Sequence, residues 1–424
     1  MIRRYFDAAI ETMPPDERRD FQVNGLKNLL KHAYTNCPAV RTKLDKVSFN
    51  HETVKSLEDL VRIPITTKDE LRALQEKDPP FGGFLAIPLA DVKTIFCSPG
   101  PIFEPEETSQ AYDRWAKCFY NSRLGKGDIV LCTFTYNMVL AGMCAQRGAN
   151  RLGATVIPAG PGNTELQVKL MRTLGVTAYL GHASFLLALI AKAEETGSDF
   201  RRDFRLRKAL CAGEILAPSL RNQLKDYGVD VIQFYGSSDV GNFAYECREK
   251  NGFHICEETI VEIVDPVTKT MLGPGEVGEV VVTPLDTRAY PLVRFGTGDL
   301  SLYTEEPCAC GRTSNRLVRI VGRVGDAARI RGMFLHPKQV DEMLSRLDEV
   351  LQWSAIVTRP GQRDELTLKI ELKPGVANTS EIEETISKEF PELCRVRPDR
   401  IEFVASGAIT DDTKSKVVDK REWK

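Results

Sequence analysis

Apolar positions repeat along this 424-residue chain with two different spacings, and the spacing changes from one region to the next. Between about residues 93 and 240, short apolar runs alternate with stretches in which apolar residues have helical spacing. DIVLCTF, ATVIPAG and VTAYLG are such runs, and AGMCAQRGANRLG and NTELQVKLMRTLG are such helical stretches. This alternation predicts a parallel, doubly wound sheet, whose ligands bind beyond the carboxyl ends of the strands.

Helical spacing precedes this region, and strands without helices follow it. Residues 1–75 are predicted to form helices joined by a loop, with Phe21 to Ala33 as one clear helical pattern. From about 255 to 320, the runs TIVEIVD, GEVGEVVVTPL and YPLVRFGTGDLSLY are separated only by Gly and Pro turns. Such a series indicates antiparallel or barrel-like structure.

The last hundred residues show a third pattern. A helix, PKQVDEMLSRLDEV, precedes two strands, WSAIVTR and ELTLKIELK, and a second helix precedes the strand RIEFVAS. A chain of this length exceeds the roughly 250–300 residues at which one core stops growing. We therefore expect an α/β protein in which residues 1–322 form a large domain with doubly wound sheets and a small β-barrel-like part. Residues 323–424 are expected to form an α+β C-terminal domain.

Composition excludes several classes of function. The formal net charge is −2, with 57 basic and 59 acidic residues, so no basic excess supports a nucleic-acid partner. The most apolar stretch, residues 129–145, is too short and too polar to span a membrane. The first twenty residues lack the apolar core of a signal peptide. These observations predict a cytoplasmic protein without a membrane partner.

Four of the eleven cysteines stand in two tight groups with a histidine. Cys247 and His254 form the first group, and Cys308 and Cys310 form the second, one β region later. In a reduced compartment, this pattern indicates a tetrahedral Cys3His zinc site, and four protein ligands give it a structural role. Cys256 is an alternative ligand. The competing interpretation is a set of ordinary buried thiols beside a surface histidine.

Three polar segments carry candidate nucleotide chemistry. YGSSD, at residues 235–239, follows the strand VDVIQF, and its hydroxyls and carboxylate suit a phosphate or a magnesium-bound nucleotide. RFGTGD places Asp299 at a strand end, where it can accept hydrogen bonds from ribose hydroxyls. The tail contains Lys414, a cation for charge developing on a phosphate. Each segment also fits a plain turn or a solvated lysine.

The whole ordered series resembles the phenylacetate–CoA ligase family of the adenylate-forming superfamily. The resemblance runs nearly end to end and rests on IPITTKDEL, VIPAGPGNTELQ, AGE at 212–214, FYGSSD, VEIVDPVTKTMLGPGEVGEVVVT, YPLVRFGTGDL, CACGRT and GRVGDAARIRGMFLHPKQVDEML. It implies an ATP-dependent ligase that activates a carboxylic acid of the aryl or arylacetic class as an acyl-adenylate and transfers it to CoA. It also implies Mg²⁺, a homodimer, and a mobile C-terminal domain that rotates at residues 325–326.

The resemblance assigns roles to matching residues. Lys414 is the adenylation lysine, with Lys416 as the alternative. Ser238 contacts the α-phosphate, Asp239 helps to hold Mg²⁺, and Asp299 binds the ribose hydroxyls. Further contacts with the nucleotide or the acid are implied at Tyr136, Gly213, Glu214, Tyr235, Gly236, Arg312 and Arg323. The family also often has a Cys, a His and a Cys-x-Cys where this chain has its cysteine–histidine groups.

One loop departs from the family pattern. The family has a Ser/Thr/Gly-rich loop with a lysine that grips the β- and γ-phosphates, whereas residues 97–108 read CSPGPIFEPEET. Prolines remove backbone donors, and the glutamates would repel a triphosphate. Asp239 also replaces the usual Glu, and Val139 replaces a frequent aromatic residue. Three interpretations stay open: a ligase that binds pyrophosphate differently, an adenylating amide or ester synthetase, and a nucleotide-binding paralogue with weak or no turnover.

Overall fold

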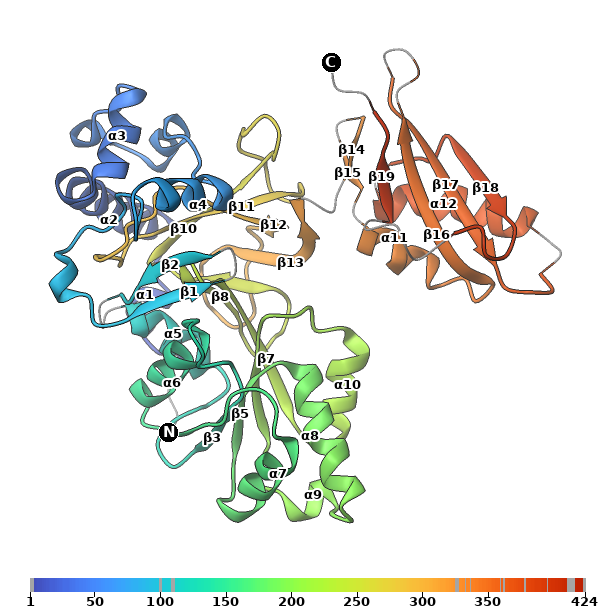
Figure 1. Cartoon of the computed structure of the whole chain (residues 1–424), viewed down its shortest axis with the longest axis horizontal. Coiled ribbons are helices and arrows are strands. Elements are labelled where there is room, and N and C mark those ends of the chain that lie inside the picture. The colour runs from blue at the N-terminus through green and yellow to red at the C-terminus, as the bar shows by residue number, and fades with distance from the viewer. Residues whose placement is uncertain are drawn as a thin grey trace. The chain divides into compact units, whose positions relative to one another are not determined.

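The structure, a computed structural model, falls into two compact units (Figure 1). Unit 1 comprises Met1–Thr297 and Leu302–Arg319, and unit 2 comprises Gly298–Ser301 and Ile320–Lys424. The residues described are 4–98, 101–107, 111–324, 328–331, 333–335, 337–358, 360, 363–376, 379–394, 396–409 and 416–421. Each unit is described by itself below.

A parallel sheet forms one half of unit 1, as the alternating pattern predicted. Its strands run in the order β4-β3-β5-β6-β7, and each neighbouring pair is parallel. The strands are β3 (Ile129–Cys132), β4 (Thr155–Pro158), β5 (Ala178–Gly181), β6 (Lys208–Cys211) and β7 (Asp230–Ser237). The helices between them are α6 (Ala141–Arg151), α7 (Thr164–Thr173), α8 (Ala183–Glu195), α9 (Phe200–Asp203) and α10 (Pro218–Asp226).

Both faces of this parallel sheet are buried. Successive side chains of a strand point to opposite faces, so Val130 and Leu131 enter different cores. Val130 belongs to the cluster that contains Phe119 of α5 (Ala111–Tyr120), whereas Leu131 belongs to the cluster that contains Leu186 of α8. Double burial explains why these strands appear in the sequence as nearly continuous apolar runs.

Antiparallel strands extend the same sheet to eleven strands in the described part of the chain. Their order is β10-β11-β12-β13-β9-β8, and β8 continues the sheet at β7. They are β8 (Gly241–Glu246), β9 (Phe253–Ile255), β10 (Thr259–Val264), β11 (Gly278–Pro284), β12 (Phe295–Thr304) and β13 (Arg316–Arg323). The antiparallel prediction for residues 255–320 is confirmed for the pairs β10–β11 and β9–β13.

The N-terminal helices cover this antiparallel half. α2 (Pro15–Asn36) places Leu26 and Leu30 in one core with Val280 of β11 and Phe295 of β12. α1 (Ala8–Glu11), α3 (Pro38–Lys46) and α4 (Lys68–Lys77) belong to the same region of the sequence. A separate antiparallel hairpin joins β1 (Ile95–Ser98) and β2 (Ile102–Pro105).

Unit 2 has its own sheet and core, in the predicted α+β order. The sheet runs β18-β17-β16-β19, with β16 and β17 antiparallel. Its elements are the hairpin β14 (Ala328–Ile330) and β15 (Met333–Leu335), α11 (Pro337–Leu344), β16 (Val350–Thr358), β17 (Glu365–Leu372), α12 (Ser380–Cys394), β18 (Arg400–Val404) and β19 (Val417–Asp419). Trp353, Leu368 and Phe390 are buried together in its core. Across both units, no helix in the described ranges combines the length and apolar character that a membrane crossing needs.

Gly148 provides a test of the α5–α6 packing. A methyl group at this position would lie 2.6 Å from Cβ of Trp115, closer than packed carbon atoms approach. We predict that Gly148→Ala lowers the free energy of unfolding by about 1–3 kcal/mol, because the two helices must move apart. Urea denaturation measures this change. Gly125→Ala is the control, because its added methyl group would have no neighbour closer than 3.7 Å. Equal stability of the two variants would contradict the packing described.

Candidate active site and metal centre

The carboxyl ends of the parallel strands gather most of the predicted unit 1 residues at one edge. Tyr235 and Gly236 end β7, and Ser238 and Asp239 follow it directly. Gly213 and Glu214 follow β6, which pairs in parallel with the first half of β7. Tyr136 follows β3 at the same edge. Neighbouring parallel strands end on the same side, so this edge is where the fold places a ligand.

β7 is the junction between the two halves of the sheet. Its residues up to Gln233 pair in parallel with β6, whereas Phe234 to Ser237 pair antiparallel with β8. β6 ends opposite Gln233, while β7 continues to Ser237. The motif YGSSD therefore lies where the pairing of the sheet changes.

The segment after β6 is held in place by a side chain that the sequence did not single out. Gly213 has a φ of +82°, and a Cβ there would lie 2.6 Å from Nε2 of His182. The imidazole of His182 meets the ring of Phe134 edge-on, with centroids 5.8 Å apart. Glu214 accepts hydrogen bonds from the N–H and the hydroxyl of Ser184, at 2.8 and 2.7 Å. The only signal for His182 was its position directly after the apolar run VTAYLG.

The two tyrosines of the site differ in their surroundings. Tyr235 packs edge-on against Phe243, with ring centroids 4.7 Å apart. Tyr136 is half-buried, and its hydroxyl has no hydrogen-bond partner among the residues described. Burial raises the pKa of Tyr136, so this hydroxyl stays protonated and can donate to a ligand.

Asp239 shares a buried polar cluster with Glu104 of β2. The Asp239 side chain is 1% exposed, and Nζ of Lys68 lies 3.3 Å from its Oδ2. Glu104 is 2% exposed and accepts a hydrogen bond of 2.8 Å from Ser98. Burial, and then the charge of Asp239, raise the pKa of Glu104 to about 7. Two carboxylates that were separate predictions therefore lie in one site.

The other two glutamates of the unusual loop are used inside the protein. Glu107 accepts hydrogen bonds of 2.7 to 3.1 Å from the backbone N–H groups of residues 288–290. Glu106 forms an ion pair with Arg147 and accepts a hydrogen bond from the Tyr112 hydroxyl. Repulsion of a triphosphate by this loop was expected from all three glutamates. Among the residues described, Glu104 and Glu107 line one cavity with Ser238 and Asp239, and Glu107 is already bound to the backbone of residues 288–290.

Several predicted residues belong to unit 2 or lie outside the described residues. Asp299 and Arg323 form an ion pair of 3.4 Å within unit 2. Lys416, the alternative adenylation lysine, donates to Asp341 at 2.8 Å. Lys414 and the hinge at residues 325–326 lie outside the described residues, as do the loop positions 99–100 and 108.

Arg312, which the sequence predicted to contact the cofactor, lies in a buried ion pair with Glu11. Its side chain is 4% exposed, and its Nε donates to Glu11 at 2.7 Å and to the Tyr245 hydroxyl at 3.1 Å. Glu11 is fully buried, so the guanidinium compensates a carboxylate that water cannot reach. We therefore leave Arg312 out of the proposed cofactor site.

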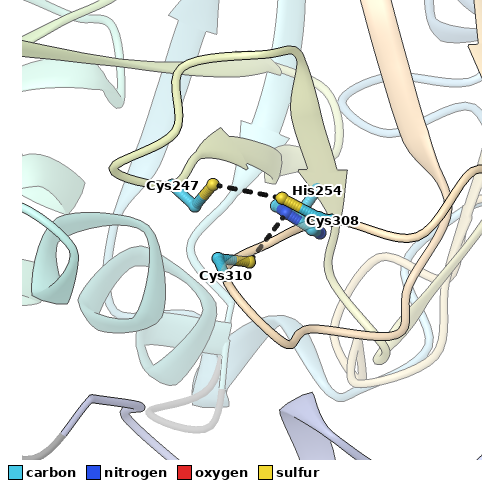
Figure 2. Close-up of side chains that lie close together, drawn as sticks. All are labelled: Cys247, His254, Cys308 and Cys310. Atoms are coloured by element: carbon cyan, nitrogen blue, oxygen red, sulfur yellow. Dashed lines mark hydrogen bonds between the residues drawn. The ribbon is translucent and has the colours of Figure 1, made fainter.

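The four predicted metal ligands converge from two segments, as Figure 2 shows. One atom from each of Cys247, His254, Cys308 and Cys310 lies within 4.8 Å of the other three, and all four side chains are buried. Sγ of Cys247 and Sγ of Cys308 are 3.7 Å apart, and Sγ of Cys310 is 3.3 Å from Nε2 of His254. Zinc–sulfur bonds of about 2.3 Å in a tetrahedron place two sulfurs about 3.8 Å apart, so the spacing fits zinc.

Strand pairing explains why distant groups meet here. β9 carries His254 and pairs antiparallel with β13, with Arg316 opposite His254, so the segment with Cys308 and Cys310, which precedes β13, lies beside the end of β9. Nδ1 of His254 contacts the hydroxyl of Ser314 at 3.3 Å, which orients the ring. Hydrogen bonds, chiefly from Cys247, and the contact with His254 lower the pKa of Cys310. Cys256, the alternative ligand, is absent from the group among the residues described.

Known proteins match this chain both in sequence and in structure. Residues 108–284 match the family model described as AMP-binding enzyme, and residues 332–421 match the AMP-binding enzyme C-terminal domain. The chain is 32% identical to a phenylacetate-coenzyme A ligase of Aromatoleum evansii, over 90% of this chain and 88% of that protein. It is 33% identical to the phenylacetate-coenzyme A ligase of Escherichia coli K12, over 86% of this chain and 84% of that protein.

Among solved structures, an open conformation of 2-hydroxyisobutyryl-CoA ligase, in complex with 2-HIB-AMP and CoA, has a TM-score of 0.90 and 26% identity. The match covers 98% of this chain and 95% of that one. The family models, the relatives that match over most of their length and this solved structure agree with the motifs at the carboxyl edge of the sheet. This chain belongs to the phenylacetate–CoA ligase family of AMP-binding enzymes.

Proposed function

We propose that this protein is an ATP-dependent acid:CoA ligase that activates an aryl or arylacetic acid. The observation that carries the proposal is the meeting of YGSSD with Gly213 and Glu214 at the carboxyl edge of the sheet. Relatives named phenylacetate-coenzyme A ligase, and a solved relative that holds an acyl-AMP and CoA, support it. ATP or AMP and CoA are therefore the expected small-molecule ligands.

The reaction has two steps. The carboxylate oxygen of the acid attacks the α-phosphorus of ATP, and pyrophosphate leaves as the acyl-adenylate forms. The deprotonated sulfur of CoA then attacks the acyl carbon, and AMP leaves with the electron pair of the broken C–O bond. Mg²⁺, when bound, neutralises phosphate charge in the first step.

We assign the remaining predicted residues to parts of this two-step reaction. Ser238 donates a hydrogen bond to the α-phosphate, and Asp299 accepts hydrogen bonds from the ribose hydroxyls. Lys414 supplies positive charge to the α-phosphate as the pentacoordinate state forms. We place adenine at Tyr235, Gly236, Gly213 and Glu214, the acid at Tyr136, and a further nucleotide contact at Arg323.

The two reaction steps suit the domain division proposed from the sequence, with one domain at residues 1–322 and the other at residues 323–424. In the reaction, the C-terminal domain moves between the two steps. A homodimer and a cytoplasmic location stay predictions from the sequence.

The two alternative functions make different demands on the loop at residues 97–108. A paralogue without turnover requires a loop that repels triphosphate. Glu106 and Glu107 are bound to Arg147 and to the backbone of residues 288–290, which reduces that repulsion and favours turnover. An amide- or ester-forming synthetase shares the first step and differs only in the acceptor. The acceptor therefore has to be identified from the product.

ATP–pyrophosphate exchange tests the first step. With a panel of aryl, arylacetic and short hydroxy acids, we predict exchange that depends on the acid, and CoA thioester as the product when CoA is added. Lys414→Ala is predicted to lower exchange by on the order of 10²–10³-fold, because charge on the α-phosphate loses its counter-ion.

Lys416→Ala is the matched control, since the Lys416 ammonium is bound to Asp341. It is predicted to keep most of the exchange activity. A larger loss in Lys416→Ala than in Lys414→Ala would transfer the role to Lys416. Absence of exchange with every acid, together with measurable ATP binding, would support the paralogue, and exchange without thioester would support the amide or ester synthetase.

We also propose that Cys247, His254, Cys308 and Cys310 hold one structural zinc ion. Three thiolates and one imidazole complete a tetrahedron, so no position stays open for a substrate. The alternative, ordinary buried thiols, does not require four ligand atoms within 4.8 Å of one another.

Metal analysis tests the zinc centre. We predict about one zinc per chain in protein purified without added metal. Cys308→Ala is predicted to remove most of the zinc and to lower the melting temperature, because the turn before β13 loses its attachment. Cys394→Ala is the control, since Cys394 is equally buried but lies in the core of unit 2. Wild-type protein without metal, or full zinc content in Cys308→Ala, would refute this ligand set.

A further inference from the structure

A narrow cavity lies beside the YGSSD motif inside unit 1. Phe96, Trp115 and Tyr290 form part of its apolar wall, and Glu104 and Asp239 bring carboxylates to it. Its volume is about 50 Å³. Since one water needs roughly 10–15 Å³ of such space, the cavity has room for about three or four water-sized groups. A triphosphate is too large to enter it.

Glu104 and Asp239 each have one oxygen in use and one without a partner, whereas both oxygens of Glu107, which also lines the cavity, accept from backbone N–H groups of residues 288–290. Oε1 of Glu104 accepts from Ser98 at 2.8 Å, and Oδ2 of Asp239 lies 3.3 Å from Nζ of Lys68. Oε2 of Glu104 and Oδ1 of Asp239 are buried, and neither accepts a hydrogen bond of ordinary geometry among the residues described, although the Ser238 hydroxyl is near enough to lower the pKa of Glu104 in part. Both side chains are almost completely shielded from solvent, at 2% for Glu104 and 1% for Asp239.

Such an arrangement is unfavourable without a cation. Unpaired carboxylate oxygens in a buried site lose their hydration, and two neighbouring negative charges repel each other. Lys68 supplies a single positive charge from the start of α4 and contacts only Asp239 of the two acids among the interactions described. Arg114, which also lines the cavity, is paired with Asp286, so Glu104 and Asp239 with one ammonium leave at least one positive charge missing.

A hard divalent cation matches these requirements. Mg²⁺ takes oxygen ligands, uses one or two carboxylates and keeps several waters, for which the cavity has room. Cys144 brings a thiol to the cavity lining, but burial raises the pKa of this thiol, so it stays protonated and is a poor ligand for a soft metal.

We propose that Glu104 and Asp239 together hold one Mg²⁺ in this cavity, so that Glu104 is a second carboxylate ligand supplied by the β1–β2 hairpin. This inference deepens the proposed function. It rests on that function only in one respect, namely that the phosphates bound by the cation are those of ATP. The second ligand compensates for Asp239, which is one methylene shorter than the usual Glu. A glutamate expected to repel a triphosphate thus attracts it through the metal.

Lys68 gives the proposal a second, opposite test. Its ammonium occupies the neighbourhood of Asp239 when no cation is bound, so lysine and metal compete for the same carboxylate. Removing the ammonium should tighten cation binding, whereas removing a ligand should weaken it. A purely structural role for Glu104 and Lys68 predicts neither change.

The experiment is a titration of the full chain, with its zinc content verified, by Mn²⁺ alone and without ATP or acid. Free Mn²⁺ is followed by electron paramagnetic resonance, and Mg²⁺ is then added as competitor. We expect one Mn²⁺ site per chain that Mg²⁺ displaces. We expect binding weaker by on the order of tenfold or more in Glu104→Gln, and several-fold tighter binding in Lys68→Met.

Glu384→Gln, an exposed carboxylate of α12 in unit 2, is the matched control and should bind Mn²⁺ as the wild type does. Circular dichroism verifies that each variant is folded. Three outcomes would each overturn the proposal. Two concern the variants: equal Mn²⁺ affinity of wild type and Glu104→Gln, and unchanged or weaker Mn²⁺ binding in Lys68→Met. The third is a wild type that binds no Mn²⁺ because the two acids share a proton.

Failure of this inference and failure of the ligase proposal give different results. If the protein shows acid-dependent exchange but its Mn²⁺ affinity does not depend on Glu104, the ligase proposal stands and Glu104 is not a cation ligand. If Mn²⁺ binding depends on Glu104 but the protein shows no exchange, the cation site stands and the ligase proposal is refuted.

Discussion

Burial of the parallel sheet on both faces is the constraint on which the candidate site depends. Val130 and Leu131, neighbours on one strand, enter separate apolar cores on opposite faces. Both faces are largely apolar, so the polar groups of the candidate site lie at the strand ends. β7 then adds a second constraint, because its pairing changes from parallel to antiparallel after Gln233. The YGSSD turn stands where these two constraints meet.

Two of the three glutamates in the loop at residues 97–108 are bound by partners that lie outside the loop. Glu107 binds the backbone of residues 288–290, and Glu106 binds Arg147 on α6. Both contacts attach the β1–β2 region to elements that follow it much later in the chain. A loop that carries three acids is therefore compatible with an anionic ligand, because two of the acids are already neutralised or hydrogen-bonded.

Sequence patterns predicted the order of elements well, because strand and helix periods depend on local burial. The runs DIVLCTF and VTAYLG became β3 and β5, and the C-terminal module has the predicted order. The four proposed zinc ligands could also be named from the sequence, since metal sites require particular residue types at close spacing. Their convergence depends on the β9–β13 pairing, which no local pattern contains.

Long-range polar contacts could not be predicted from the sequence. Arg312 was assigned to a cofactor on the basis of a motif, but it is bound to Glu11, about three hundred positions earlier. Two further features also join residues that are distant in the sequence. His182 contacts Gly213, and Glu104 and Asp239 line one cavity. Each depends on which loops the folded sheet brings together. A single sequence carries no signal for that choice beyond the presence of a titratable residue at a strand end.

The contact between Glu11 and Arg312 has a consequence for biosynthesis. Tyr5 donates to the carbonyl of Cys310, and the N–H of Thr313 donates to the carbonyl of Glu11, so residues 5–11 are fixed to the turn that carries Cys308 and Cys310. On a ribosome, the segment that emerges first cannot reach its final position until residue 313 has been synthesised. Glu11, which is fully buried in the folded protein, lacks its partner Arg312 until that point. The first helix of this protein is thus among the last to be fixed in place.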